Sequence, residues 1–211
     1  MKTTTPGKTH PPSKTRTPIK KRQMQKQDTR SRILHKAAKL FRKQGLAKTG
    51  VDEIMKAAGL TVGGFYNHFT SKNDLIAESL GTALEDAKLR LLKDPSQTTA
   101  IYLSPQHRDR PEEGCVLAAL ASELPSQNAT VKRRIENHLE SWVTDFTAQG
   151  LTRAESLEVV SRAVGALILS RIVESEKLSD EILRAGRDQN LSLKRSRSSA
   201  SVKSSKAKRS R

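Results

Sequence analysis

The chain has 211 residues, carries a formal net charge of +17 and is 35% hydrophobic. No apolar run approaches the about 18 residues that a transmembrane helix needs. No apolar run follows the basic N-terminus as it would in a secretory signal. The single cysteine, Cys115, excludes an internal disulfide and a zinc site built from cysteines. We therefore expect a soluble, cytoplasmic protein without a membrane partner.

The positive charge is concentrated at the two ends. Residues 1–27 and 192–211 each contain eight Lys/Arg and no acid. Both ends have few apolar residues, so burial cannot offset the entropy lost on ordering them. We expect disordered basic tails over 1–25 and 192–211. Such tails would either contact DNA phosphates with release of counterions or act only as solubilising ends.

The middle of the chain is also uneven in charge. Residues 28–72 hold nine basic and three acidic side chains, a net charge of +6, whereas residues 73–191 hold fourteen and nineteen, a net charge of −5. The smaller segment is suited to an anionic partner and the larger one is not.

Four helices are predicted in the first part of the middle, and no strands. Apolar residues spaced by three and four predict a helix over 29–44, which Asp28 or Thr29 can cap and Gly45 can end. A shorter helix follows over 50–58, with Thr49 and Asp52 resembling a capping box. A third is predicted over 62–68, and a fourth opens at Ser71.

Two short helices that follow a longer one predict a helix-turn-helix. Its second helix contains Gly63 and Gly64, each of which costs about 1 kcal/mol relative to Ala in a helix. Glycine is useful where a backbone approaches DNA closely, because it has no Cβ. The alternative is a plain turn between packed helices.

The rest of the chain is predicted to be helical as well. Residues 131–146 form an amphipathic pattern, and residues 154–173 are apolar on nearly all sides. A helix of the second kind must be buried, either in its own chain or against a partner. Ala163, Gly165 and Ala166 would allow another helix to approach closely. The predicted fold class is all-α.

Residues 49–72 have the sequence TGVDEIMKAAGLTVGGFYNHFTSK and resemble the DNA-binding segment of the TetR/AcrR family of bacterial regulators. This resemblance covers residues 26–86. Residues 102–109 and 114–123 are similar to the ligand-binding, dimerising domain of one branch of the family, which extends the resemblance to about residue 187. The family implies an N-terminal three-helix DNA-binding domain over 26–86 and a C-terminal dimerisation and effector domain over 87–191.

The resemblance also implies which residues contact DNA. Val62, Gly63 and Gly64 would face base edges, with Thr61 as the polar side chain beside them. Tyr66, His68 and Lys72 would contact phosphates, which suits two neutral donors and a cation at a helix N-terminus. Thr49 completes the expected set. Phe65 and Phe69 are predicted to be core residues that hold the recognition helix in place.

For the C-terminal domain, the family implies a dimer whose interface is a four-helix bundle formed by residues 154–173 and about 179–187. Two recognition helices would then bind an inverted-repeat operator. The expected function is that of a repressor released from double-stranded DNA by a small-molecule effector. The segment 93–101 is shorter than the family pattern, which leaves ligand-independent regulation open.

Other residues give weaker hypotheses. Ser104, His107 and Asp109 have the chemistry of a catalytic triad, but they lie on one short loop, whereas a triad is assembled from separate elements. We expect no enzyme activity, no cofactor and no metal site. Cys115 is expected to be a buried structural residue, with a redox sensor as the alternative. A sequence-tolerant architectural DNA-binding protein, driven by its tails, is the alternative function.

Overall fold

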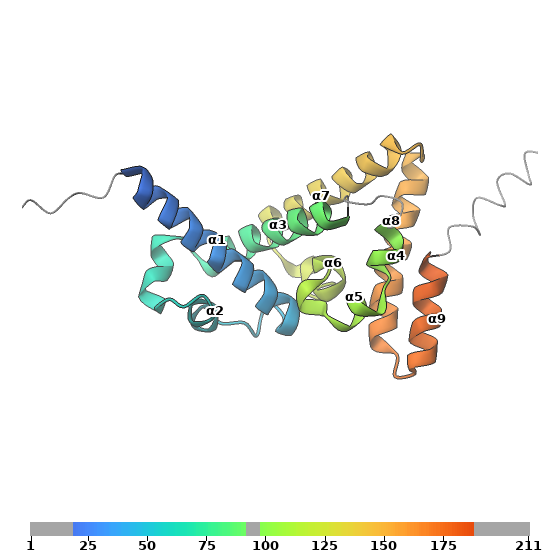
Figure 1. Ribbon diagram of the computed structural model, residues 1–211, viewed down its shortest axis with the longest axis horizontal. Coiled ribbons are helices and arrows are strands. Elements are labelled where there is room, and N and C mark those ends of the chain that lie inside the picture. The colour runs from blue at the N-terminus through green and yellow to red at the C-terminus, as the bar shows by residue number, and fades with distance from the viewer. Residues whose placement is uncertain (1–18, 92–97, 188–211) are drawn as a thin grey trace, which may run out of the picture.

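The computed structural model describes residues 19–91 and 98–187, and within these ranges the chain is helical without strands. Residues 1–18 of the tail expected over 1–25, the whole tail expected over 192–211 and most of the short segment 93–101 lie outside the described residues. Figure 1 shows α1 and α2 at one end of an elongated molecule, α3 and α7 across its middle, and α8 and α9 at the other end. The elements are α1 (Ile19–Gln44), α2 (Val51–Ala57), η1 (Val62–Asn67), α3 (Lys72–Leu91), α4 (Thr98–Tyr102), α5 (Pro105–Asp109), η3 (Pro111–Glu113), α6 (Val116–Ala119), η4 (Leu124–Ser126), α7 (Ala129–Ala148), α8 (Arg153–Ile172) and α9 (Glu176–Arg187).

Helix α1 begins ten residues earlier than the sequence pattern predicts, at Ile19 rather than Thr29. The first turns therefore occupy residues 19–25, which we had assigned to a disordered tail. Lys, Arg, Gln and Met all have high helix propensity, and no Pro or Gly follows until Gly45. The predicted end is confirmed: Gly45 has φ +92° and its N–H donates to the Phe41 carbonyl at 2.8 Å.

The helix-turn-helix is present, but its details differ from the prediction. Helix α2 is capped by Gly50 without a side-chain hydrogen bond, so the capping box of Thr49 and Asp52 is wrong. Gly59 ends the helix with φ +70°, as expected. The recognition element η1 is a 3₁₀ helix rather than an α-helix, which is consistent with a six-residue stretch containing two glycines.

Helix α3 connects the recognition element to the rest of the molecule. The Ser71 hydroxyl accepts a hydrogen bond from the Asp74 N–H at 3.1 Å, so Ser71 opens this helix as predicted. The Arg30 guanidinium of α1 pairs with the Glu78 carboxylate of α3. The core between these helices consists of fully buried apolar side chains, the largest being Ile33, Phe41, Phe65, Phe69 and Leu75.

The C-terminal helices begin at well-formed caps. The Asn128 side chain accepts from the Val131 N–H at the start of α7. Thr152 and Glu155 form a reciprocal capping box at the start of α8. Helix α9 runs back along α8, and the Ser179 hydroxyl donates to the Ser170 carbonyl at 2.6 Å between them.

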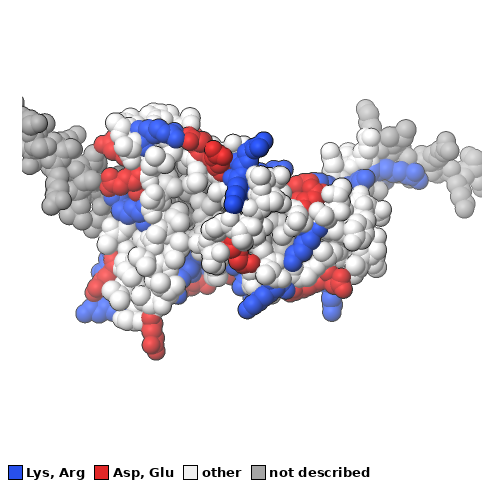
Figure 2. All heavy atoms as spheres, turned by 180° about the vertical axis from the view of Figure 1, so that it is seen from behind, with Lys and Arg blue, Asp and Glu red and all other residues white. Residues whose placement is uncertain are grey.

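Helix α8 is buried on only one side within this chain. Leu167 is fully buried, whereas Leu169 and Ile172 have exposed fractions of 51% and 70%. Leu157 and, on α9, Leu178 are also exposed. At the end of the molecule that contains α8 and α9, uncharged surface runs between small groups of charged side chains (Figure 2). The helix whose sequence is apolar on nearly all sides therefore has one face packed within the chain and one face exposed.

A carboxylate connects the two halves of the molecule. Glu123, just before η4, accepts hydrogen bonds from the Leu46 N–H at 3.1 Å and the Ala47 N–H at 2.9 Å. These two N–H groups belong to the turn between α1 and α2. Nearby, the Arg42 Nε donates to the Glu112 carbonyl at 2.9 Å. The turn that leads into the helix-turn-helix is thus fixed to the C-terminal half by charge-assisted hydrogen bonds.

Candidate nucleic-acid interface

The recognition element presents an exposed outer face on a buried support. Tyr66 has an exposed fraction of 78% and Val62 one of 43%, whereas Phe65 and Phe69 are 2% exposed. The Phe65 and Phe69 rings stack at 5.7 Å between centroids, and the Tyr66 ring stands edge-on to Phe65 at 5.2 Å. The two phenylalanines are core residues, as predicted, and they fix the orientation of the exposed side chains.

The fold does not require glycine at positions 63 and 64. Neither residue has a positive φ. A Cβ built on Gly63 would have no neighbour within 4 Å, and one built on Gly64 would lie at ordinary contact distance, 3.8 Å, from the Met55 side chain. Glycine here lowers helix propensity without relieving any internal contact. The packing of the described chain therefore gives no reason for glycine at these two positions.

Threonines flank the recognition element in different environments. Thr61 is exposed at the start of η1 and makes no capping hydrogen bond through its side chain. Thr49, by contrast, is completely buried, and its hydroxyl donates to the Gly45 carbonyl at 2.6 Å. The expected DNA contact by the Thr49 side chain is therefore corrected: this side chain stabilises the turn after α1.

His68 closes the recognition element beside a group of cations. It is half-buried, and its Nδ1 has no hydrogen-bond partner among the described residues. Burial lowers the pKa of His68, and the positive charges of Lys26 and Arg30 lower it further. Both causes favour the neutral form of the imidazole, and a neutral imidazole N–H can donate to a phosphate oxygen.

Two lysines from different helices, Lys72 of α3 and Lys26 of α1, are further candidates for this surface. Lys72 is the first residue of α3, where the N-terminal end of the helix also favours anions. Lys26 lies on the part of α1 that we had not predicted to be helical, and it is exposed. The sequence analysis missed Lys26 as a member of this surface, because nothing in its local pattern shows that α1 passes His68.

The expected DNA-binding residues are therefore brought together, with one exception. Thr61, Val62, Gly63, Gly64, Tyr66, His68 and Lys72 lie on or beside η1, whereas the side chain of Thr49 is inside. The surface combines backbone that is accessible at two glycines, neutral hydrogen-bond donors and cations. This combination fits a polyanion whose shape must be followed closely.

The second group of candidate residues, Ser104, His107 and Asp109, does not form a relay. Ser104 caps α5, accepting from the His107 N–H at 3.2 Å and donating to the Ile101 carbonyl at 2.8 Å. The His107 ring bonds to the Tyr102 carbonyl through Nδ1 and to the Cys115 N–H through Nε2. Asp109 pairs with Arg108. These side chains organise the loop, and Cys115 is buried beside it.

Two searches of the described residues complete the survey of sites. None of the helices in these ranges combines the length and apolar character of a membrane span. No group of three or more His, Cys, Asp or Glu side chains in the same ranges is arranged to hold a metal ion.

Comparison with known proteins places the helix-turn-helix in a family. Residues 33–79 match the model for bacterial regulatory proteins of the tetR family. The chain is 46% identical over 59 residues to the regulator AcrR of Shigella flexneri, which covers 28% of this chain and 27% of that protein. It is 24% identical over 134 residues to the repressor DhaR of Mycobacterium sp. (strain GP1), covering 58% of this chain and 66% of DhaR. The chain thus spans less than two thirds of the length of each.

The solved structures agree on the whole fold. A TetR-family regulator from Agrobacterium tumefaciens superimposes with a TM-score of 0.62 over 78% of this chain and 98% of that one, at 23% identity. At this identity the match establishes the fold alone. The sequence match in the DNA-binding segment and the fold of the entire described chain point to the same group. Residues 33–79 therefore form a DNA-binding segment of the tetR type, and the described chain has the fold of TetR-family regulators.

Proposed function

We propose that this protein is a sequence-specific transcriptional repressor that binds an inverted-repeat operator as a homodimer. The observation that carries the proposal is the pair Gly63 and Gly64, which the fold does not need and which open the backbone of an exposed recognition element. Val62 supplies a methyl contact for a base edge, and Tyr66, His68 and Lys72 supply phosphate contacts. The relative DhaR is named as a repressor, which supports repression rather than activation.

The uncovered face of α8 supports the dimer. Leu157, Leu169 and Ile172 are exposed in the single chain, and a Cβ on Gly165 would have no neighbour within 4 Å. Successive residues of a helix are separated by 100°, so these four positions lie within about one third of its circumference. A second copy of α8 and α9 would cover this apolar surface. The dimer would present two recognition elements to successive major grooves.

Release by a small molecule forms the last part of the proposal. An effector must bind one arrangement of the two recognition elements more tightly than the other, since otherwise it shifts no population. Helix α3 is the element that both halves share, because it starts at Lys72 beside the recognition element and packs against α7 in the C-terminal half.

The decisive experiment measures binding of the full chain to DNA from upstream of its own gene, by fluorescence anisotropy at physiological salt. We expect binding at least about 1,000-fold tighter than to a scrambled sequence of the same composition. Tyr66→Phe and Lys72→Ala should weaken it, and the matched exposed substitution Lys177→Ala on α9 should not. Equal affinity for the two DNAs would contradict sequence-specific regulation.

The architectural alternative predicts a different outcome for truncated chains. A protein that binds DNA through its tails would lose binding when residues 1–18 and 192–211 are removed. The proposed repressor would keep its preference for the operator and lose only part of its salt-dependent affinity. Comparing the two lengths on both DNAs separates these functions.

A further inference from the structure

An arginine of α1 covers the turn that joins the recognition element to α3. The guanidinium carbon of Arg30 lies 4.8 Å from the centroid of the Phe69 ring. Phe69 is buried and stacks on Phe65, the central core residue of η1. A cation above an aromatic ring is attracted by the negative charge density of its face. Arg30 therefore contacts one of the two side chains that fix the orientation of the recognition element.

The same guanidinium is bound to α3 by a bidentate ion pair. Its terminal nitrogens, Nη1 and Nη2, contact different oxygens of the Glu78 carboxylate. The planar fork of arginine matches a carboxylate in this way, whereas a lysine ammonium acts as a point charge. Both side chains of the pair are partly buried. The ion pair thus fixes the position in which the guanidinium covers Phe69.

The hydrogen bonds of the turn itself are local. The N–H groups of His68 and Phe69 both donate to the Phe65 carbonyl, at 2.9 and 3.1 Å. The N–H and the hydroxyl of Thr70 donate to the Asp74 carboxylate of α3, at 3.0 and 3.2 Å. These hydrogen bonds determine the shape of the turn and attach it to α3. Its position against α1 depends on contacts between side chains.

We propose that Arg30 is a positioning residue for the DNA-binding surface: stacked on Phe69 and held by Glu78, it fixes the recognition element between α1 and α3. Arg30 acts through its neighbours and not as a phosphate ligand, because both of its terminal nitrogens face the Glu78 carboxylate. This inference rests on the proposed repressor for its DNA measurements, whereas its first two measurements need no DNA.

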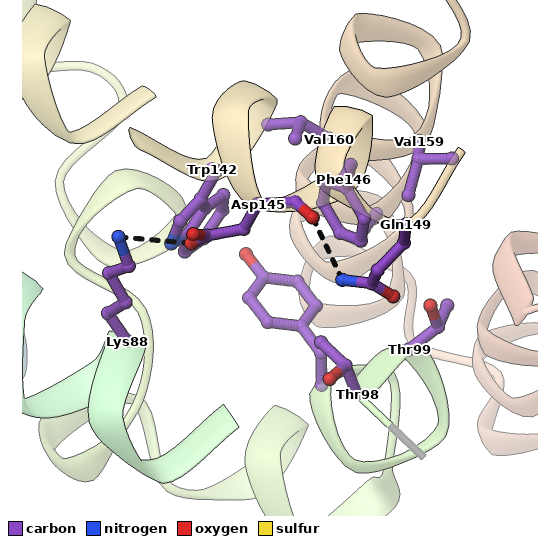
Figure 3. Close-up of a pocket in the computed structure, with 11 residues that line it drawn as sticks. Lys88, Thr98, Thr99, Trp142, Asp145, Phe146, Gln149, Val159 and Val160 are labelled. Carbon is purple, nitrogen blue, oxygen red and sulfur yellow. Dashed lines mark hydrogen bonds and ion pairs between the residues drawn. The ribbon is translucent and has the colours of Figure 1, made fainter. Parts of the chain in front are cut away.

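Helix α3 provides a matched comparison at its other end. Lys88 pairs with the Asp145 carboxylate of α7 at 3.0 Å, and both side chains are again partly buried. Figure 3 shows this pair beside a small cavity between α4, α7 and α8. Residues 78 and 88 are separated by about 15 Å along the helix. Lys88→Met therefore removes a comparable ion pair of the same helix without changing a contact of the recognition element.

The first measurement is amide hydrogen exchange of the free protein by NMR, for the wild type, Arg30→Met and Lys88→Met. In Arg30→Met we expect the amides of His68 and Phe69 to exchange about tenfold faster, which corresponds to the loss of one cation–aromatic contact. Lys88→Met should leave these two rates at the wild-type value. An unchanged rate in Arg30→Met, or the same acceleration in both variants, would overturn the positioning role.

The imidazole of His68 gives a second measurement, which a general loss of stability would not change in the same way. Burial is the main cause of the lowered pKa of His68, and the positive charges of Lys26 and Arg30 also lower it. Arg30→Met removes one of these charges and loosens the turn, so the pKa of His68 should rise towards 6.5. NMR titration of the ring measures this change. A pKa that stays at the wild-type value would overturn the placement of Arg30 beside this turn.

The third measurement is DNA binding by the full chain at several salt concentrations. Arg30→Met should lower the affinity for DNA from upstream of its own gene about tenfold, and the affinity for a scrambled sequence by less. The slope of log affinity against log salt should not change, because a residue that contacts no phosphate releases no counterion. A phosphate ligand would instead reduce the slope by about 0.9 and weaken both complexes equally, and this result would overturn the proposal.

Glu78→Gln, a milder substitution, separates positioning from charge. It makes the surface around Arg30 more positive and at the same time weakens the ion pair that holds the guanidinium. We expect the preference for the upstream DNA over the scrambled sequence to fall about threefold, although the net positive charge has increased. Tighter binding to both DNAs would identify Arg30 as a phosphate ligand and overturn its positioning role.

These outcomes distinguish the inference from the proposed function. If the wild type binds both DNAs equally, the proposed function fails, whereas amide exchange and the titration of His68 still decide whether Arg30 positions η1. If the wild type prefers the upstream DNA but Arg30→Met keeps this preference and the wild-type exchange rates, the function stands and the positioning role is overturned.

Discussion

The two halves of this molecule differ in where they leave groups without contacts inside the chain. The DNA-binding half is well packed inside, with Phe41, Phe65 and Phe69 almost fully buried, and its accessible glycines and Tyr66 lie on the outside. The C-terminal half has unpaired polar groups inside, at His138 and Tyr102, and an uncovered apolar face on α8.

This difference indicates the kind of partner that each half is suited to bind. An outer surface with open backbone and hydrogen-bond donors fits a large anionic partner that stays outside. An exposed apolar helix face, such as that of α8, fits another protein surface.

The largest effect is expected at the uncovered face of α8. Ile172→Glu should leave the monomer folded, because this side chain is 70% exposed. In a dimer the same carboxylate would be buried without a partner, at about 3–5 kcal/mol, which corresponds to at least a 100-fold loss of operator affinity. Sedimentation and DNA binding measure the two effects.

Thr130→Glu provides the control for this substitution, because it adds the same charge at an exposed position in the first turn of α7. It should keep the dimer and the operator affinity of the wild type. A dimer that survives Ile172→Glu would show that α8 does not form the interface.

The interior of the C-terminal half should make stability depend on pH. The pKa of His138 is lowered from 6.5 to about 4, mainly by burial and also by the charge of Lys88, while Asp145 acts in the opposite direction. Between these pKa values the unfolded chain binds more protons than the folded one. The stabilisation that is present above pH 6.5 is therefore lost as the pH falls towards 4, by about 2–3 kcal/mol.

Urea unfolding of the wild type and of His138→Phe between pH 6.5 and pH 4 measures how much His138 contributes to this pH dependence. The difference between their unfolding free energies should shift in favour of the variant as the pH falls. A difference that stays constant with pH would mean that the imidazole is solvated and not buried as a neutral group.

Glycine substitutions should have opposite consequences in the two halves. Gly63→Ala has open space for its Cβ, so the free energy of unfolding should stay equal or rise by up to about 1 kcal/mol, whereas operator affinity should fall about tenfold. In Gly114→Ala the Cβ would lie 2.5 Å from His107 Nε2, which should cost about 1–3 kcal/mol of stability. Unchanged DNA binding by Gly63→Ala would contradict close approach of the backbone.

The smallest effect is expected for a single phosphate contact. Lys72→Ala should weaken binding severalfold and equally for all operator variants, because phosphates carry no sequence information. It should also reduce the slope of log affinity against log salt by about 0.9. Lys26→Ala tests in the same way whether α1 contributes a phosphate contact. An unchanged slope would remove the substituted lysine from the interface.

The sequence predicted the elements that have strong local patterns. The helix that ends at Gly45, the turn at Gly59 and the core positions of Phe65 and Phe69 follow from spacing and from the conformational preference of glycine. The start of α1 was missed, because a run of Lys, Arg and Gln carries no apolar period even though its helix propensity is high.

The site was harder to predict where it depends on packing between distant residues. Thr49 is buried because its hydroxyl meets the Gly45 carbonyl, a contact that exists only once the turn has formed. His138 of α7 is buried, and only the packed structure shows that its ring nitrogens find no hydrogen-bond partner among the described residues. Local spacing contains no information on either point.

The hydrogen bonds of Glu123 to the α1–α2 turn have a thermodynamic consequence. Moving the two halves apart would leave the Leu46 and Ala47 N–H groups without this carboxylate partner. Because these hydrogen bonds join the two halves, unfolding of one half removes them and lowers the stability of the other. Heating should therefore give one calorimetric transition for the described chain, and Glu123→Ala should broaden it or divide it into two.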